Sequence, residues 1–225
     1  MSLMNKKVVV FDLDDTLYNE ISYLKSAFHE IALIVSDKLG FEKATIFKQM
    51  MNSYYSKENV FENLIRTFNL NYDKQFFIEI YRTHKPKLEI APDRINLIKY
   101  LKKQNIPMCI LTDGRSIQQR NKLEALGIMQ YLSEIIISEE IGSEKPHKKN
   151  YKYFEKVLGK AQFFYIGDNP KKDFITPNKM GWITICIKDI GFNIHSQNVL
   201  LENAWYYPKY SASNFTEIGD IIKSI

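Results

Sequence analysis

Three carboxylates are crowded into four positions near the N-terminus of this sequence. Asp12, Asp14 and Asp15 directly follow the apolar run 8–11, which predicts a buried strand. Two unit charges about 4 Å apart repel each other by about 4 kcal/mol at an effective dielectric constant of about 20. Such a cluster needs a proton, a cation or open water beside it. A divalent cation at the end of a sheet would turn the cluster into a possible reaction centre.

Two further groups of polar residues follow predicted strands. Thr112 and Asp113 come directly after an expected strand at 106–111. Asp168 comes after an expected strand at 162–166, with Asp173 five residues further on, and Lys145 lies in the loop that opens an expected helix at 147–158. Ligands of open parallel sheets bind beyond the carboxyl ends of the strands. Several such groups therefore indicate one shared site rather than packing.

The elements that would position these groups alternate along the second part of the chain. The expected helices are at 93–103, 116–126, 147–158, 171–179 and 215–224, and the expected strands are at 106–111, 134–138, 162–166 and 182–187. This alternation predicts an α/β fold, a Rossmann-like parallel sheet flanked by helices on both faces. Residues 188–214 have no assigned element. Packing on the core is preferred for their aromatic side chains, over an edge strand or a partner surface.

A helical segment interrupts this series after the first strand. Residues 20–39 have apolar side chains at helical spacing up to Gly40, and 45–82 continue with aromatic stripes that favour packing, with Asp73 as a possible cap of the last helix. We expect a small helical cap domain at 19–87, inserted into an α/β core domain made of 1–18 and 88–225.

Composition limits the classes of protein to which the chain can belong. Its 225 residues are 45% apolar and 25% charged, as in soluble globular proteins. No apolar run reaches the length of a membrane span, and no signal peptide is expected. Cys109 and Cys186 fall in predicted buried strands, so reduced core thiols and a cytoplasmic location are expected.

The net charge of +5 comes partly from one lysine-rich segment. A solvated helix face is preferred there over a positive field that attracts phosphorylated substrates. Nucleic-acid binding is not expected because no recognition motif accompanies the charge. The lysines are Lys145, Lys148, Lys149, Lys152, Lys156 and Lys160.

The strand-end groups resemble, in order, the four motifs of the haloacid dehalogenase (HAD) superfamily of phosphohydrolases. Residues 12–16 (Asp-Leu-Asp-Asp-Thr) resemble motif one, and 111–113 (Leu-Thr-Asp) resemble motif two. Lys145 resembles motif three, and Gly167-Asp168 with Asp173 resembles motif four. The resemblance spans residues 7 to about 190 and likens the helical insertion to the C1-type cap of this family.

The resemblance implies a covalent mechanism. Asp12 would attack phosphorus and form an aspartyl-phosphate. Asp14 would protonate the leaving oxygen and then deprotonate the attacking water. Mg²⁺ would lie between Asp12, the backbone carbonyl of Asp14, Asp168 and the phosphate.

The resemblance also implies a phosphate-binding set. Thr112 and the adjacent backbone amide of Asp113 would bind phosphoryl oxygens, and Lys145 would offset charge on both the nucleophile and the substrate. Asp173 would hold Lys145 or a metal-bound water. The implied activity is a magnesium-dependent phosphatase for a small phosphorylated metabolite. The oligomeric state is open.

Other activities remain as alternatives at this point. A phosphomutase would use the same aspartyl-phosphate, and no sequence feature separates it from a phosphatase. Haloacid dehalogenases and the phosphonate-cleaving branch depart from this pattern at the position of Asp14, which disfavours both. A phospho-accepting switch module would be shorter, would lack the cap, and would keep its acidic pair on a strand other than that of the acceptor.

Several neighbouring residues have plainer interpretations. Asp15 is expected to cap a turn, and Asn169 to shape its loop rather than touch substrate. Arg115 and Ser116 open the helix beside Thr112 and could contact substrate, but capping of that helix is at least as well supported. In the segment 82–87 a solvated hinge is preferred over a contact with the leaving group. Substrate specificity would depend on the cap and on loop residues such as Tyr18, Asn19 and Arg115, but the identity of these side chains does not reveal the substrate.

Overall fold

The computed structural model describes residues 6–198, 200 and 203–225. The strands are β1 (Lys7–Phe11), β2 (Met108–Thr112), β3 (Glu134–Ile137), β4 (Gln162–Gly167), β5 (Ile183–Ile187) and β6 (Tyr210–Ala212). The helices before β2 are α1 (Glu20–Leu39), α2 (Lys43–Tyr55), α3 (Val60–Phe68), α4 (Lys74–Thr83) and α5 (Pro92–Lys103). The later helices are α6 (Ser116–Ala125), α7 (Ser138–Ile141), α8 (Lys148–Leu158), α9 (Ile175–Lys179) and α10 (Phe215–Ser224), with short 3₁₀ turns η1 (Met129–Tyr131) and η2 (Ala204–Tyr206).

The six strands form one parallel sheet in the order β3-β2-β1-β4-β5-β6. β1 lies between β2 and β4, and Phe11 pairs with Ile110 on one side and Ile166 on the other. The strand order reverses direction next to β1, which is where open α/β sheets bind their ligands. This arrangement confirms the expected Rossmann-like parallel sheet flanked by helices.

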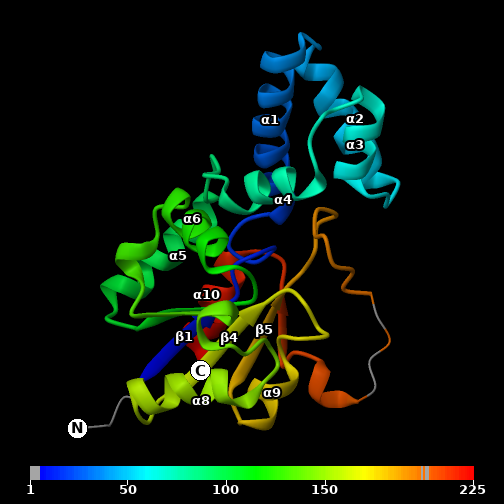
Figure 1. The fold of residues 1–225 in the computed structure, drawn as a ribbon. Coiled ribbons are helices and arrows are strands. Elements are labelled where there is room, and N and C mark those ends of the chain that lie inside the picture. Colours follow the sequence, from blue (N-terminus) through cyan, green and yellow to red (C-terminus); the bar gives the residue numbers. More distant parts are fainter. Residues whose placement is uncertain (1–5, 199, 201–202) are drawn as a thin grey trace, which may run out of the picture.

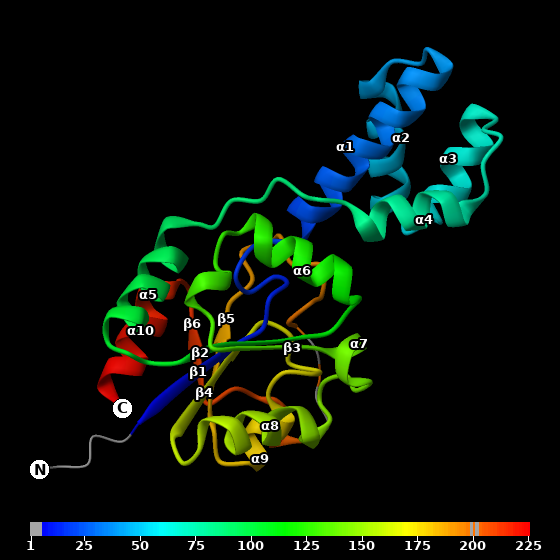
Figure 2. The ribbon, with the colours of Figure 1, turned by 60° about the vertical axis from the view of Figure 1, so that its left-hand side comes forward.

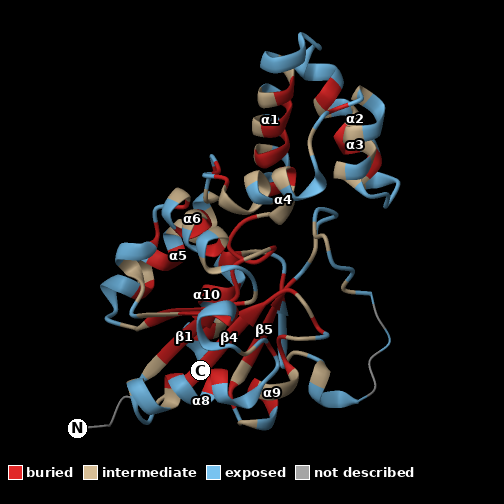
Figure 3. Cartoon of the chain, in the orientation of Figure 1, coloured by how far each residue is buried: buried red, intermediate tan, exposed pale blue. Residues whose placement is uncertain are grey.

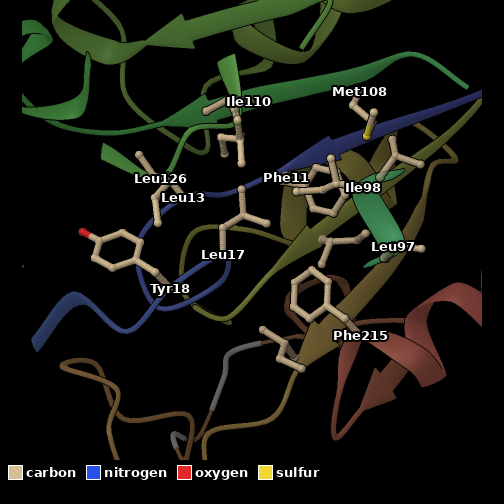
Figure 4. Close-up of a cluster of buried hydrophobic side chains, with 14 of the residues drawn as sticks. Phe11, Leu13, Leu17, Tyr18, Leu97, Ile98, Met108, Ile110, Leu126 and Phe215 are labelled. Atoms are coloured by element: carbon tan, nitrogen blue, oxygen red, sulfur yellow. The ribbon is translucent and has the colours of Figure 1, made fainter. Parts of the chain in front are cut away.

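Helices cover both faces of the sheet (Figures 1 and 2). Val9 and Phe11 point to the face covered by α5, α6 and α10, whereas Val8 and Val10 point to the face covered by α8 and the segment around α9. Figure 4 shows the first of these clusters, with Phe11 and Phe215 among the packed side chains. Because both faces are buried, β1 is a continuous apolar run rather than an alternating one.

Helices α1–α4, called here the four-helix unit, stand apart from the sheet and have their own buried core (Figures 1 and 3). The aromatic and aliphatic stripes of the sequence pack against one another there, as expected. Asp73 caps α4 by accepting from the N–H of Phe76, and Gly40 ends α1 at φ 72°, a left-handed conformation that favours glycine. The division into domains at 18/19 and 87/88 stays a prediction.

Two short segments connect the four-helix unit to the sheet, and α6 contacts one of them. The side-chain amide of Asn121 donates to the backbone carbonyls of Thr83 and His84, at 3.0 Å each. The Lys122 ammonium lies 4.7 Å from the ring centroid of Tyr23 in α1. These contacts fix the start of α1 and the end of α4 against the helix that follows β2.

Three sequence-based assignments are corrected by the structure. The helix expected at 171–179 is confined to Ile175–Lys179, because the preceding residues form a turn in which Asn169 Oδ1 accepts from the N–H of Lys171. The strand expected at 106–111 is Met108–Thr112. The segment expected to pack on the core adds the edge strand β6, while its aromatic residues Trp205 and Tyr207 stay about half exposed.

Among the described residues, no helix combines the length and apolar character needed to span a bilayer. Cys109 and Cys186 are buried and free, as expected for strand positions.

Truncating a central side chain of the four-helix unit tests whether that core holds it together. Phe77 is fully buried, so Phe77→Ala is expected to lower the free energy of unfolding by about 3–5 kcal/mol. Phe41→Ala is the matched control, because Phe41 is 43% exposed and its truncation should cost less than about 1 kcal/mol. Urea denaturation followed by circular dichroism measures both. Equal costs would contradict this packing.

Candidate active site

The polar groups that end β1, β2 and β4 meet around one cavity of about 290 Å³. Asp12 directly follows β1, and its N–H donates to the carbonyl of Ile166 in β4 at 2.8 Å, so the two strand ends stay together. Because these strands are neighbours and parallel, their carboxyl ends open on the same edge. The lining residues are Asp12, Asp14, Asp15, Glu20, Thr112, Asp113, Gly114, Glu144, Lys145, Asp168, Asn169, Lys172 and His195.

Asp12 is a buried carboxylate with one close cation. Its Oδ1 lies 2.8 Å from Nζ of Lys145. Burial raises the pKa of Asp12 to about 7, although the Lys145 ammonium opposes that rise. Asp12 therefore depends on a nearby positive charge to stay ionised at neutral pH, and an ionised carboxylate that faces a cavity can act as a nucleophile.

Lys145 links three acidic groups that are distant in the sequence. Its ammonium lies 2.8 Å from Oδ1 of Asp173 as well as from Asp12, and its backbone N–H donates to Oδ1 of Asp113 at 2.9 Å. Burial disfavours the charged ammonium, but Asp12, Asp173 and Asp113 outweigh it and raise the pKa of Lys145 well above its ordinary value. Lys145 is thus a buried permanent cation beside the cavity.

Asp173 is fully buried and accepts hydrogen bonds at both oxygens. Besides Lys145, Oδ1 accepts from the hydroxyl of Tyr165 at 3.1 Å, and Oδ2 accepts from the N–H of Asn169 at 2.8 Å. Gly167 makes this approach possible, because a Cβ at that position would lie 2.4 Å from Oδ2 of Asp173. The glycine before Asp168 therefore leaves room for the carboxylate that anchors Lys145.

Asp12, Asp168 and Asp173 offer carboxylate oxygens that lie within 4.8 Å of one another. Burial, with the charges of Asp173 and Asp12, raises the pKa of Asp168 to about 9. When all three carboxylates are ionised, the Lys145 ammonium balances only part of their charge, and this repulsion adds to the effect of burial on the pKa of Asp12 and Asp168. Oxygen ligands at this spacing suit a hard divalent cation, so the donor set fits Mg²⁺. Asp173 is already held by three donors, so Asp12 and Asp168 are the freer pair.

Asp14 faces the cavity but is held by α6 and by its own loop. Its Oδ1 accepts from Nζ of Lys122 at 2.7 Å and from the hydroxyl of Tyr18, and its Oδ2 accepts from Nε2 of Gln119 at 2.8 Å. Figure 4 shows the Tyr18 ring within the apolar cluster and its hydroxyl directed out of it. Burial opposes ionisation, but Lys122 outweighs it and lowers the pKa of Asp14.

Thr112, the last residue of β2, and Asp113, which follows it, both line the cavity. Thr112 Oγ1 accepts from Nε2 of Gln119 at 2.6 Å, and Oδ2 of Asp113 lies 3.0 Å from Nζ of Lys172. The Asp113 side chain therefore ties the Lys145 loop to the loop after β4, and its backbone is the part left for a ligand.

The segment after β5 contributes to the site although its sequence has no period. Asn193 Nδ2 donates to Oδ2 of Asp168 at 2.9 Å, and the N–H of Ile194 donates to Oδ2 of Asp15 at 2.7 Å. Asp15 adopts φ 52° and also accepts from the N–H of Glu20, the first residue of α1, at 2.8 Å. Asp15 thus shapes a turn, as expected, and joins the start of α1 to the loop at 188–198.

The structure adds residues that sequence reasoning missed. Gln119 and Lys122 are polar, three residues apart and almost fully buried on α6. Polar side chains on the buried face of a helix are the signal that could have identified them. Asn193 carries no such signal, because nothing local marks its loop as part of the site.

Two neighbouring residues differ from expectation. Arg115 and Ser116 do not cap α6 with their side chains. Instead Arg115 pairs with Glu139 of α7 at 2.5 Å, and the N–H of Ser116 donates to the same carboxylate at 2.7 Å. Asn169 shapes its loop through the bonds to Lys171 and Asp173, as expected.

Comparisons with known proteins show which proteins this chain resembles. A family model described as haloacid dehalogenase-like hydrolase matches residues 9–187. The glyceraldehyde 3-phosphate phosphatase of Methanocaldococcus jannaschii is 30% identical over 97% of this chain and 98% of its own length. The same-named protein of Methanopyrus kandleri is 28% identical over 81% of this chain and 84% of its own length. The human N-acylneuraminate-9-phosphatase is 23% identical over 100% of this chain and 97% of its own length.

Solved structures share the fold. A putative HAD-hydrolase from Bacillus subtilis bound to magnesium aligns with a TM-score of 0.66 at 20% identity, over 97% of this chain and 99% of that one. A HAD phosphatase from Thermococcus onnurineus aligns with a TM-score of 0.61 at 21% identity, over 96% and 97%.

Glu20 gives a pH-dependent prediction of stability. Burial, with the charge of Asp14, raises the pKa of Glu20 to about 8. A carboxyl group with a raised folded-state pKa contributes its full stability below its unfolded pKa of about 4.3 and loses it as the pH rises through the folded value. The difference in Tm between Glu20→Gln and wild type should therefore increase, in favour of the variant, by at least about 3 °C as the pH rises from 4.5 to 8.5.

Calorimetry with a chelator present measures this gain. Glu89→Gln, at an exposed position, should keep a constant difference from wild type over the same range. A pH-independent difference for Glu20→Gln would show that its carboxyl group is not perturbed by the folded chain.

Proposed function

The chain belongs to the haloacid dehalogenase-like hydrolase family, and we propose that it is a magnesium-dependent phosphatase that hydrolyses a small phosphorylated metabolite through an aspartyl-phosphate. The observation that carries this proposal is the placement of Asp12. Its carboxylate lies at the cavity, 2.8 Å from the buried ammonium of Lys145 and within 4.8 Å of Asp168 oxygens. These neighbours support an ionised nucleophile beside a binding site for a second cation.

Two transfers would complete the reaction. An oxygen of Asp12 attacks phosphorus, and the bond between phosphorus and the leaving oxygen breaks while that oxygen takes a proton from Asp14. A water molecule then attacks the phosphorus of the aspartyl-phosphate and gives its proton to Asp14. The bond to Asp12 breaks, and inorganic phosphate is released.

Asp14 is better prepared for the second transfer than for the first. It accepts bonds from Lys122, Gln119 and Tyr18, which favour its charged form. A charged carboxylate can take a proton from water directly. To protonate a leaving group, Asp14 must first gain a proton and loosen at least one of these bonds.

The phosphoryl group would be held from two segments, the end of β2 and the loop that carries Lys145. Thr112 and the backbone N–H of Asp113 would donate hydrogen bonds to phosphoryl oxygens. Lys145 would offset the negative charge on Asp12 and on the phosphoryl group during the transfer. Asp173 would hold Lys145 in place through the bond observed at 2.8 Å. Asp12, Asp168 and the backbone carbonyl of Asp14 would hold Mg²⁺, which when bound supplies positive charge next to the nucleophile and the phosphate.

The proposed substrate is small because the cavity is small. About 290 Å³ lies at the lower end of ligand-site volumes and suits a phosphate with a few further atoms. The four-helix unit, with Glu20 from α1 lining the cavity, would act as a cap over it. Relatives named glyceraldehyde 3-phosphate phosphatase make that compound the first candidate to assay.

The thiols of Cys109 and Cys186 are free and buried, which is consistent with a protein that acts in the reducing cytoplasm.

Phosphate release by wild type and by Asp12→Asn tests this function. Wild type with Mg²⁺ is expected to release inorganic phosphate from glyceraldehyde 3-phosphate and from an aryl phosphate, and a chelator should abolish release. Asp12→Asn should lower kcat at least about 1,000-fold, because an amide cannot be phosphorylated in the same way. Asp37→Asn, at an exposed position of α1, is the matched control and should keep full activity.

Residual activity of Asp12→Asn within tenfold of wild type would contradict the assignment of Asp12 as the nucleophile. A panel of sugar phosphates separates the two activities. If an isomerised phosphosugar forms in place of free phosphate, the protein is a phosphomutase rather than a phosphatase.

Asp14→Asn separates the two transfers. Without a carboxylate to accept the proton of water, the aspartyl-phosphate should form from an aryl phosphate with a good leaving group and then persist. Intact-protein mass spectrometry should therefore show one added phosphoryl group on most molecules of this variant. Absence of that mass at every time point would contradict the assignment of Asp14 to the hydrolytic step.

A further inference from the structure

The side chain of Gln119 lies between two groups of the proposed machinery. It comes from the middle of α6 and is only 1% exposed. Its Nε2 lies 2.8 Å from Oδ2 of Asp14 and 2.6 Å from Oγ1 of Thr112. One amide nitrogen therefore touches both the acid–base carboxylate and the phosphate-binding hydroxyl.

The ionised state of Asp14 determines the orientation of the Gln119 amide group. A carboxylate that pairs with Lys122 at 2.7 Å is ionised and can only accept hydrogen bonds. The NH₂ group of Gln119, rather than its carbonyl oxygen, must therefore point to Asp14. An amide NH₂ has two hydrogens, so the second is available to Thr112.

The amide in turn decides the role of the Thr112 hydroxyl. Because Oγ1 accepts from Gln119, the hydroxyl hydrogen is not used in that bond and can point elsewhere. The remaining contact of this hydroxyl, with the carbonyl of Asp113, is long at 3.5 Å and therefore weak. Thr112 lines the cavity, so the hydrogen is free to be donated there.

The local backbone is shaped to let Gln119 reach both partners. Gly114, in the turn between β2 and α6, adopts φ 138°, and a Cβ on it would lie 3.2 Å from Cδ of Gln119. The glycine thus gives the amide room directly behind Thr112. Lys122, one turn further along α6, holds the other oxygen of Asp14.

We propose that Gln119 is a positioning residue that directs the Thr112 hydroxyl to donate into the cavity and holds Asp14 at a fixed separation from it. The inference rests on the proposed function and adds a residue to it. Gln119 is not among the residues that line the cavity, so it acts through Thr112 and Asp14. Its shared NH₂ group couples the hydroxyl that binds a phosphoryl oxygen to the carboxylate that moves the proton.

Gln119→Glu tests the direction of the hydroxyl with almost no change in shape. The new carboxyl group would share one proton with Asp14, whose Oδ2 lies 2.8 Å from the replaced nitrogen, so no hydrogen is left to donate to Thr112. Thr112 would then turn its own hydrogen toward Glu and away from the cavity. We expect at least about a 100-fold loss in kcat/KM, the effect of removing one donor to a developing charge. Gln119→Met, which leaves the hydroxyl free to rotate, should lose less, about tenfold.

Binding of inorganic phosphate with Mg²⁺, measured by isothermal titration calorimetry, gives a readout that does not depend on turnover. Gln119→Glu also alters the charge around Asp14, which affects phosphate binding, and the Thr112→Val background separates that effect from the effect of the hydroxyl. Gln119→Glu should weaken binding at least about fivefold more with Thr112 present than with Val in its place. Gln119→Met keeps the comparison possible if Gln119→Glu unfolds.

Equal effects of Gln119→Glu in both backgrounds would overturn the inference, as would equal activity of the Glu and Met variants. Failure of the proposed function has a different signature. In that case wild type would release no phosphate from any phosphomonoester, whereas the inference fails when wild type is active and the two backgrounds respond alike. If wild type is inactive, the calorimetric comparison still decides the inference.

Discussion

The structure depends on one buried ammonium placed among carboxylates that would otherwise repel one another. Lys145 contacts Asp12 and Asp173 at 2.8 Å each, and all three side chains are buried. Buried charges are tolerated when they are paired and hydrogen-bonded, and removing one partner of such a pair typically costs about 3–5 kcal/mol. Asp113 fixes the backbone of Lys145, and Gly167 makes space for Asp173, so several segments serve this single contact.

The parallel sheet explains how such a charged cluster is assembled. β1, β2 and β4 are neighbours, and their carboxyl ends deliver polar residues to one edge while both faces of the sheet are covered by helices. The apolar packing thus holds the strand ends rigidly, and the carboxylates remain at the rim where a cavity admits ligand. A divalent cation that joins Asp12 and Asp168 would complete the charge balance that Lys145 begins.

A second network joins the site to the four-helix unit. Asp14 is held by α6 through Gln119 and Lys122, and Lys122 also lies over the ring of Tyr23 at the start of α1. Asp15 accepts from the first N–H of α1 and from the loop at 188–198. Movement of the four-helix unit would therefore act on the residues that follow Asp12, which couples the proposed cap to Asp14, the proposed acid–base group.

The sequence by itself determined the parallel sheet, because strands and helices alternate along the chain, and the strand-end groups, because an apolar run followed by polar residues is a local pattern. Helical spacing likewise indicated the four-helix unit. The bonds of Asp14 to Gln119 and Lys122 span 105 and 108 positions, and the bond between Asp15 and Ile194 spans 179. Only the tertiary structure decided these contacts, since they depend on which helix face packs against the site and on how a loop without a period is held. Neither leaves a repeating signal in the chain.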